Sequence, residues 1–215
     1  MEKEIISYIR DEYNPDAIVL AGSRIKGTAQ EDSDWDLWVL GSENNASGFF
    51  HFKGTLLDIT TKNWPEEGKP LTTPYSPVWP LNVLWDASNG RLASLLKTTE
   101  EAFNKGPLDL YKSGVLERFA KLSRWQGKMK KYQAEPMVEC FYANIFYEFA
   151  IRAWFELQNK WVLAPAESIP YIKNNDQEFF ELLRTFVITE SLNRGKVAQD
   201  IFRKLEALKN QLDVE

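Results

Sequence analysis

Hydrophobic and polar positions repeat with different periods in the two halves of the chain. Up to about residue 106, short apolar runs are separated by turn-forming residues, whereas from residue 108 onward apolar residues recur every three or four positions. The first pattern predicts strands joined by turns and short helices, and the second predicts amphipathic helices. We therefore expect an α+β fold, with an N-terminal mixed-sheet domain at residues 1–106 and an all-α helical bundle at residues 107–215.

The N-terminal half is expected to begin with a short helix, because Ile5, Ile6 and Ile9 share one helical face before Asn14-Pro15 ends it. Five prolines between residues 62 and 80 predict an irregular segment, which Trp64, Tyr75 and Trp79 would pin to the body of the domain. The strands are predicted at residues 16–21, 35–40, 49–53, 55–61 and 82–86, with further helices at 23–29 and from Asn89-Gly90 to about 104.

The C-terminal half is expected to contain four helices that form a small bundle. Glu135-Pro136 and a loop from Pro165 to Pro170 interrupt the pattern. Trp125, Trp154 and Trp161 are expected to pack in the core or between helices, and Cys140 lies on an apolar face where we expect burial. The predicted helices span residues 108–132, 136–158, 176–188 and 190–212.

Composition narrows the class of function. A net charge of −5 across 215 residues provides no broad basic surface, which argues against a long nucleic acid as partner and favours a small substrate, cationic ones included. One cysteine and one histidine exclude a Cys-rich zinc site, an internal disulfide and a multi-His metal site. Neither a signal peptide nor a membrane span is visible, so we expect a cytoplasmic protein without a membrane partner. Exposed aromatic side chains would be compatible with a homodimer.

Two aspartates one residue apart provide the candidate chemistry. Asp34 and Asp36 would point to the same side of a strand, only a few ångströms apart, and two like charges there need a cation. Gly22-Ser23, ahead of them, would open a short helix whose free backbone N–H groups favour an anion such as phosphate. A divalent cation next to phosphate indicates phosphoryl or nucleotidyl transfer.

The run from Gly22 to Asp36, with a later lone carboxylate at Asp58, resembles the signature of the nucleotidyltransferases with the DNA-polymerase-beta-like fold. That signature is Gly-Ser, about ten residues, Asp-x-Asp, and a third acidic residue on a later strand. Arg24 and Gly27 also agree with the form Gly-Ser-Arg-x-x-Gly-x-Ala of small members. The helical half is similar, by architecture only, to the substrate-side bundle of the small antibiotic-modifying, aminoglycoside-type members.

The resemblance implies an enzyme of the EC 2.7.7 type. Such an enzyme transfers a nucleoside monophosphate, here expected to be AMP, from ATP or another NTP to a hydroxyl or phosphate of a small-molecule acceptor and releases pyrophosphate. Asp34 and Asp36 would hold one Mg²⁺, and a second Mg²⁺ would be shared with Asp58. Gly22, Ser23 and Arg24 would contact the nucleotide phosphates, with Lys26 as a further cation.

The helical half leaves two interpretations open. Asn144, Glu148 and Arg152 share a face. In the functional interpretation, Glu148 takes the acceptor proton or binds a cationic substrate. In the structural interpretation, Glu148 forms an i,i+4 ion pair with Arg152. Glu139 is a second candidate for a base. For the whole chain, the competing function is that of an antitoxin-like or regulatory nucleotidyltransferase, which binds or adenylylates a protein partner.

Overall fold

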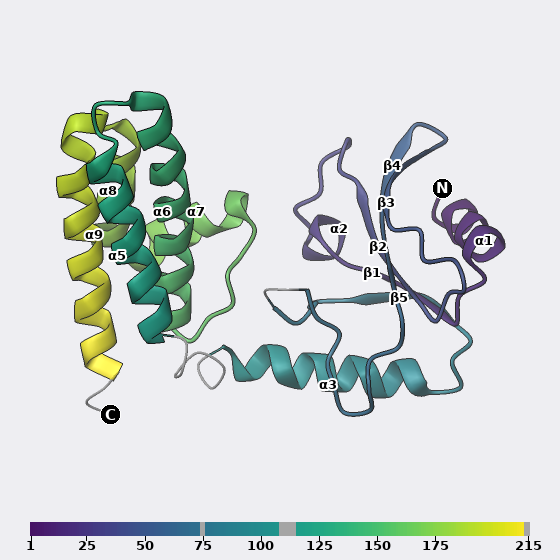
Figure 1. Cartoon of the computed structure of the whole chain (residues 1–215). Helices are drawn as coiled ribbons and strands as arrows, with labels where there is room; N and C mark the ends of the chain where they lie inside the picture. The colour runs from purple at the N-terminus through teal and green to yellow at the C-terminus, as the bar shows by residue number, and fades with distance from the viewer. Residues whose placement is uncertain (74–75, 108–114, 213–215) are drawn as a thin grey trace. The chain divides into compact units, whose positions relative to one another are not determined.

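A mixed sheet of five strands, in the order β3-β4-β2-β1-β5, lies at the centre of the first part of the chain (Figure 1). Only β2 and β4 pair in parallel; the other neighbouring strands are antiparallel. The structure, a computed structural model, describes residues 1–73, 76–107 and 115–212. The chain divides into two units, Met1–Lys105 and Gly106–Glu215. The α+β class with an N-terminal mixed sheet is therefore confirmed.

The elements of the first unit follow the predicted order closely. The predicted strand at 35–40 is reproduced with the same bounds, and the hairpin turns at Lys53-Gly54 as expected. The short helix after Gly22 ends three residues earlier than predicted, at Lys26, and Gly27 follows it in a left-handed conformation. The elements are α1 (Glu2–Tyr13), β1 (Ala17–Leu20), α2 (Ser23–Lys26), β2 (Trp35–Leu40), β3 (Gly48–Phe52), β4 (Thr55–Lys62), β5 (Asn82–Asp86) and α3 (Arg91–Lys105).

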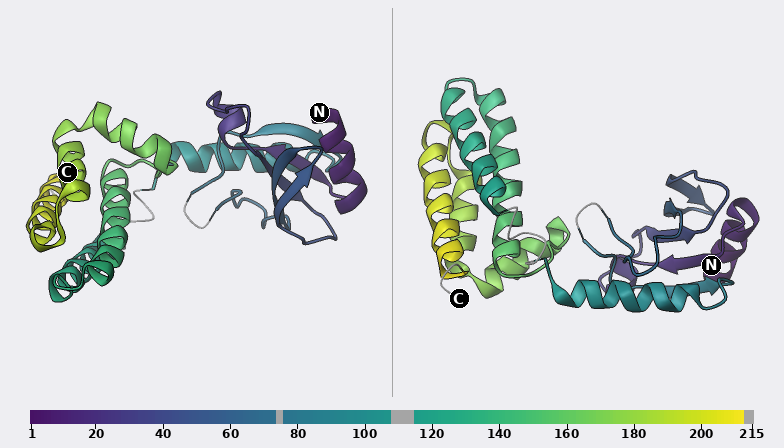
Figure 2. Two further views of the ribbon diagram at one scale, coloured as in Figure 1. Left: turned by 90° about the horizontal axis from the view of Figure 1, so that it is seen from above. Right: turned by 60° about the horizontal axis from the view of Figure 1, so that its bottom comes forward.

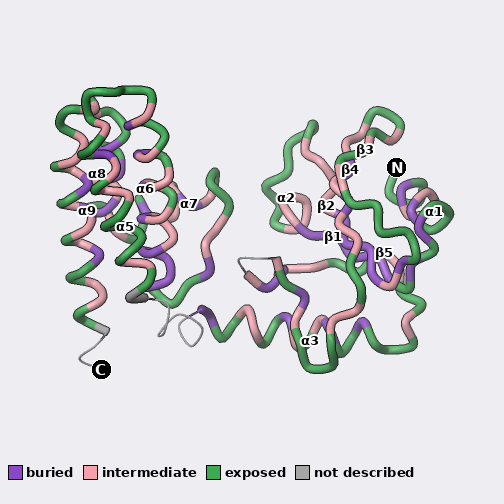
Figure 3. Tube along the Cα trace, in the orientation of Figure 1, coloured by how far each residue is buried: buried purple, intermediate pink, exposed green. Residues whose placement is uncertain are grey.

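Each face of the sheet has its own core. On one face, Ile5 and Ile9 of α1 pack with alternate residues of the central strands, including Leu37 and Val39. On the other face, Leu92 of α3 packs with the remaining residues of those strands and with the irregular segment. Since both faces are covered, β1 is buried along its whole length (Figure 3). This burial fixes which side of β2 each side chain occupies.

The irregular segment between β4 and β5 is held to the sheet, as the sequence predicted for Trp64. The indole Nε1 of Trp64 donates a hydrogen bond to Asp16 Oδ2 at 2.7 Å. Leu71 is buried in the second core, and the Thr72–Pro77 bridge gives the segment its one β-type contact among the described residues. The expectation for Tyr75 lies outside the described residues.

The second unit is helical, and α5, α6, α8 and α9 run alongside one another in it (Figure 2). Its core centres on α6, where Trp154, Phe146 and Phe155 are fully buried. None of the described helices combines the length and apolar character needed to cross a membrane. The helices are α5 (Val115–Lys131), α6 (Pro136–Leu157), α7 (Pro165–Asn175), α8 (Gln177–Ile188) and α9 (Ser191–Leu212).

Two expectations for the helical half are wrong. The predicted loop from Pro165 to Pro170 is the first half of helix α7, which begins with Pro165. Proline is favoured at this position, because its fixed φ suits the helix and its missing N–H would have no intrahelical partner. Cys140 is exposed rather than buried, on the solvent side of α6. Of the predicted helix at 108–132, residues 108–114 lie outside the described residues.

Candidate active site

Three aspartate side chains converge at the sheet. Asp36 on β2 is the register partner of Asp58 on β4, and Asp34 lies just ahead of β2. One carboxylate oxygen from each of the three lies within 4.8 Å of the others. Asp36 and Asp58 come from two parallel strands that neighbour each other in the sheet but are separated in the sequence, and Asp34 comes from the loop that leads into β2. The structure therefore brings together all three of the carboxylates that the sequence singled out.

The pleat of the two strands determines which face carries this cluster. Leu37 and Val39 lie in the core under α1, so Asp36 faces the other way, on the side of Trp38. In β4, Leu57 and Ile59 are likewise buried in the α1 core. Asp58, between them, consequently points to the same side as Asp36.

The electrostatics of the cluster suit a divalent cation. Partial burial, followed by the charges of Asp34 and Asp58, raises the pKa of Asp36; its own backbone and Lys26 oppose the rise. Burial, followed by the charge of Asp34, raises the pKa of Asp58. Three acidic oxygens that repel one another are the hard ligands that Mg²⁺ prefers. The residues present therefore fit the metal that the sequence implied.

The backbone conformation and the surroundings of residue 22 explain why a glycine stands ahead of Ser23. Its φ is 74°, in the left-handed region that favours glycine, and a Cβ added to it would overlap the carboxylate of Asp36. Next to it, the N–H of Ala21 donates to Asp36 O at 2.9 Å. The Gly-Ser turn therefore runs directly against the acidic cluster.

Ser23 and Arg24 are the first residues of α2. Within the described part of the chain, the Ser23 hydroxyl has no hydrogen-bond partner, which leaves its side chain available to a ligand. Arg24 is engaged: its Nε donates to Asp34 O at 2.9 Å and its Nη2 to Ser33 O. Its guanidinium also lies over the ring of Trp35, 4.9 Å from the centroid. The sequence reading missed Trp35, although its place between the two aspartates was a signal that could have drawn attention to it.

Residues 3–64 match the family described as "Polymerase beta, Nucleotidyltransferase". These residues form a domain of the nucleotidyltransferase superfamily with the polymerase-beta-like fold. A search of curated proteins found no match to this chain. The matched segment runs from α1 through β4, so it includes the Gly-Ser turn and all three aspartates. A domain of this kind supports nucleotidyl transfer in general, with a nucleoside triphosphate as substrate.

In the helical unit, Glu148 pairs with Arg152. Nη2 of Arg152 lies 2.7 Å from Oε1 of Glu148, which is the structural ion pair that one of the two interpretations predicted. The Glu148 side chain is nevertheless 61% exposed. Asn144 does not extend this pair, since its amide contacts Cys140 Sγ at 3.9 Å.

Glu139 is buried and lies between helices. Its side chain is 1% exposed, and its Oε2 accepts a hydrogen bond at 2.5 Å from Nη1 of Arg194 on α9. Burial raises the pKa of Glu139, and the charge of Arg194 opposes the rise. These contacts make Glu139 a link between α6 and α9, shielded from solvent.

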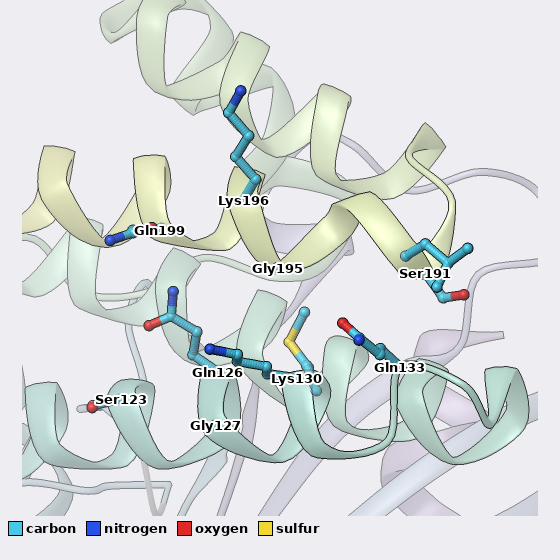
Figure 4. A pocket seen from close by; sticks show the side chains of 11 residues that line it. Ser123, Gln126, Gly127, Lys130, Gln133, Ser191, Gly195, Lys196 and Gln199 are labelled. Carbon is cyan, nitrogen blue, oxygen red and sulfur yellow. The ribbon is translucent and has the colours of Figure 1, made fainter.

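The helical unit also carries a groove of about 550 Å³ between α5 and α9 (Figure 4). Gly127 on α5 and Gly195 on α9 line it, and a Cβ added to either would meet no atom within 4 Å. The two glycines therefore leave space open and do not serve close helix packing. The other lining residues are Ser123, Gln126, Met129, Lys130, Gln133, Ser191, Leu192, Lys196 and Gln199.

Proposed function

We propose that this protein is an EC 2.7.7-type enzyme that transfers a nucleoside monophosphate, with AMP as the expected group, from an NTP to a hydroxyl or phosphate of a small-molecule acceptor, in a Mg²⁺-dependent reaction. The observation that carries the proposal is the convergence of Asp34, Asp36 and Asp58, whose oxygens lie within 4.8 Å of one another beside the Gly-Ser turn. Repulsion among the three carboxylates favours a bound cation, and transfer at a triphosphate needs bound cations.

The reaction forms one bond and breaks one. The acceptor oxygen attacks the α-phosphorus of the NTP, the bond from that phosphorus to the bridging oxygen breaks, pyrophosphate leaves, and the acceptor proton passes to solvent or to a base. Mg²⁺ held by Asp34 and Asp36, with a second ion shared with Asp58, would neutralise charge on the leaving group and lower the pKa of the acceptor hydroxyl.

The residues of the chain itself would position the metal ions and the triphosphate. The pairing of β2 with β4 holds Asp36 opposite Asp58, so the two carboxylates need little reorganisation to bind an ion. The backbone of Gly22 and the unpartnered hydroxyl of Ser23 would hold the β- and γ-phosphates. Lys26 adds a positive charge close enough to lower the pKa of Asp36.

We extend the proposal to the domains: residues 1–106 would form the nucleotidyltransferase domain, and residues 107–215 the acceptor side. The net charge of −5 supports a small and even cationic acceptor. Glu148 is the candidate to bind such a cation, since much of its side chain is exposed. Glu148→Gln should then raise the KM for a cationic acceptor while leaving kcat unchanged; an unchanged KM would exclude this role.

The test is pyrophosphate release by the purified chain with Mg²⁺, α-labelled ATP and a panel of aminoglycosides, lincosamides, nucleotides and peptides. We expect label on one acceptor class, and we expect Asp36→Asn to reduce turnover by more than about 100-fold, because it removes a direct ligand. Asp32→Asn is the matched control: it removes one charge from an exposed residue of the same loop and should leave turnover unchanged. Equal turnover of wild type and Asp36→Asn would reject the site, and label found only on a protein would favour the regulatory alternative.

A further inference from the structure

Asp34 is the one aspartate of the cluster that no strand holds. Asp36 and Asp58 lie within paired strands, where ladder hydrogen bonds fix the backbone. Asp34 precedes β2, at the end of the irregular stretch 27–34 that connects α2 to that strand. Its backbone position must therefore be fixed by something other than the sheet.

Arg24 supplies this restraint. Its guanidinium donates from Nε to Asp34 O and from Nη2 to Ser33 O, so two consecutive carbonyls are held by one rigid planar group. The same group lies over the Trp35 ring, on the residue that follows Asp34. Three successive residues, Ser33 and Asp34 of the loop and Trp35 at the start of β2, therefore contact one side chain that lies nine to eleven positions earlier in the sequence.

We infer that Arg24 is a positioning residue for the metal site: it holds Asp34 in place as a ligand and is not primarily a phosphate ligand. This inference rests on the proposed function for the role of Asp34. Outer-shell partners of metal ligands commonly change metal affinity by about 10- to 100-fold when they are removed. Because Arg24 directly follows Ser23, the contact also ties the phosphate-binding turn to the metal-binding loop.

Arg24→Lys is the informative substitution, because it keeps the positive charge and removes the planar fork. A lysine ammonium cannot make both carbonyl contacts in this geometry, so Asp34 should lose its fixed position although the local charge is unchanged. Arg10→Lys is the matched control. The guanidinium of Arg10 lies over the Trp85 ring at 5.0 Å, a similar stacking contact in the same unit, but on α1.

The first measurement is Mn²⁺ binding to the full chain without nucleotide. Binding is detected through the electron paramagnetic resonance signal of free Mn²⁺. We expect Arg24→Lys to raise the Kd by about 10- to 100-fold, and Arg10→Lys to leave it within about twofold of wild type. Trp35→Leu keeps both hydrogen bonds and removes the ring, so it should produce a smaller increase than Arg24→Lys.

The second measurement is hydrogen exchange of the backbone amides, which needs no metal. Arg24→Lys should speed exchange in residues 28–35 and leave β4 unchanged, and Arg10→Lys should not affect either segment. Unchanged exchange in residues 28–35 would overturn the inference on its own.

The outcomes separate this inference from the proposed function. If wild type binds Mn²⁺, Asp36→Asn abolishes binding and Arg24→Lys binds as wild type does, the positioning role is wrong and the proposed function stands. If Arg24→Lys instead loses affinity only for ATP in the absence of metal, Arg24 is a phosphate ligand and the inference is overturned. If wild type itself binds no Mn²⁺, the proposed metal site fails, and faster exchange in residues 28–35 still supports Arg24 as the residue that holds the loop.

Discussion

At the scale of single residues, the acidic cluster is a source of instability that a cation would relieve. Burial and mutual repulsion raise the pKa of both Asp36 and Asp58. An acid whose pKa is higher in the folded than in the unfolded state stabilises the fold while it is protonated, at low pH, and loses this contribution as the pH rises through the folded pKa. The chain therefore accepts a stability cost at neutral pH in the absence of a cation.

Asp36→Asn should remove this cost. Without divalent cations, the variant should have a higher melting temperature than wild type. The difference should widen between pH 4 and pH 7, because only wild type has a carboxyl group at position 36 that loses its proton and becomes charged as the pH rises. Adding Mg²⁺ should shrink or reverse the difference, because the ion binds the folded wild-type site. Melting curves across this pH range, with and without Mg²⁺, provide the test; a difference that does not change with pH would contradict the assignment.

At the scale of elements, most of the fold was predictable because it depends on local pattern. The period of two predicted the strands β2 and β4, whereas the association of Asp58 with Asp34 and Asp36 was expected only from the resemblance to the nucleotidyltransferase signature. The contact between Arg24 and Asp34 was not predictable, since it depends on how residues 27–34 fold back, and no periodicity records that. Helix α7 was missed because two prolines within six residues are typical of a loop, although Pro165 at a first helical position favours a helix.

Asp176 links helices α6 and α8 of the second unit. Its side chain caps α8 by accepting from the Phe179 N–H at 3.0 Å, and it also accepts from Trp154 Nε1 on α6 at 3.0 Å. Asp176→Ala should cost on the order of 2–4 kcal/mol of unfolding free energy, from the lost cap and the unpaired buried indole N–H.

The control for Asp176 is Asp200→Ala, which removes an exposed i,i+3 pair with Arg203. It should change stability by less than about 0.5 kcal/mol. Chemical denaturation of both variants, followed by helical circular dichroism, makes the comparison; equal effects would show that Asp176 is not the link described.

Substitution of the two glycines that line the α5–α9 groove should increase stability, in contrast to Asp176→Ala. Gly127→Ala and Gly195→Ala should each stabilise the helical unit by about 0.5–1 kcal/mol, because alanine favours a helix and the space beside each glycine is open. Gly106→Ala should destabilise it, since φ is 75° there and a Cβ would lie 2.7 Å from Asn159 O. Thermal unfolding of the three variants measures the signs, and a loss of stability in the two helix variants would show that the groove is closed.

At the scale of the whole molecule, the division into two units predicts that a ligand of the acidic cluster stabilises only the unit that contains this cluster. Met1–Lys105 holds the acidic cluster and Gly106–Glu215 has its own core. If the units unfold as separate transitions, Mg²⁺ with ATP at about 100 times its Kd should stabilise the first by about 2.7 kcal/mol and leave the second unchanged. Differential scanning calorimetry resolves the transitions, and an equal shift of both, or of neither, would contradict the prediction.

The parallel pairing of β2 with β4 also limits where insertions and deletions can occur during the evolution of this chain. Successive side chains of a strand face opposite ways, so one residue gained or lost in β4 ahead of position 58 would turn the aspartate into the core beneath α1. Insertions and deletions among related chains should therefore gather in the loops, such as residues 41–47 and 63–81, and inside β4 should occur only in even numbers.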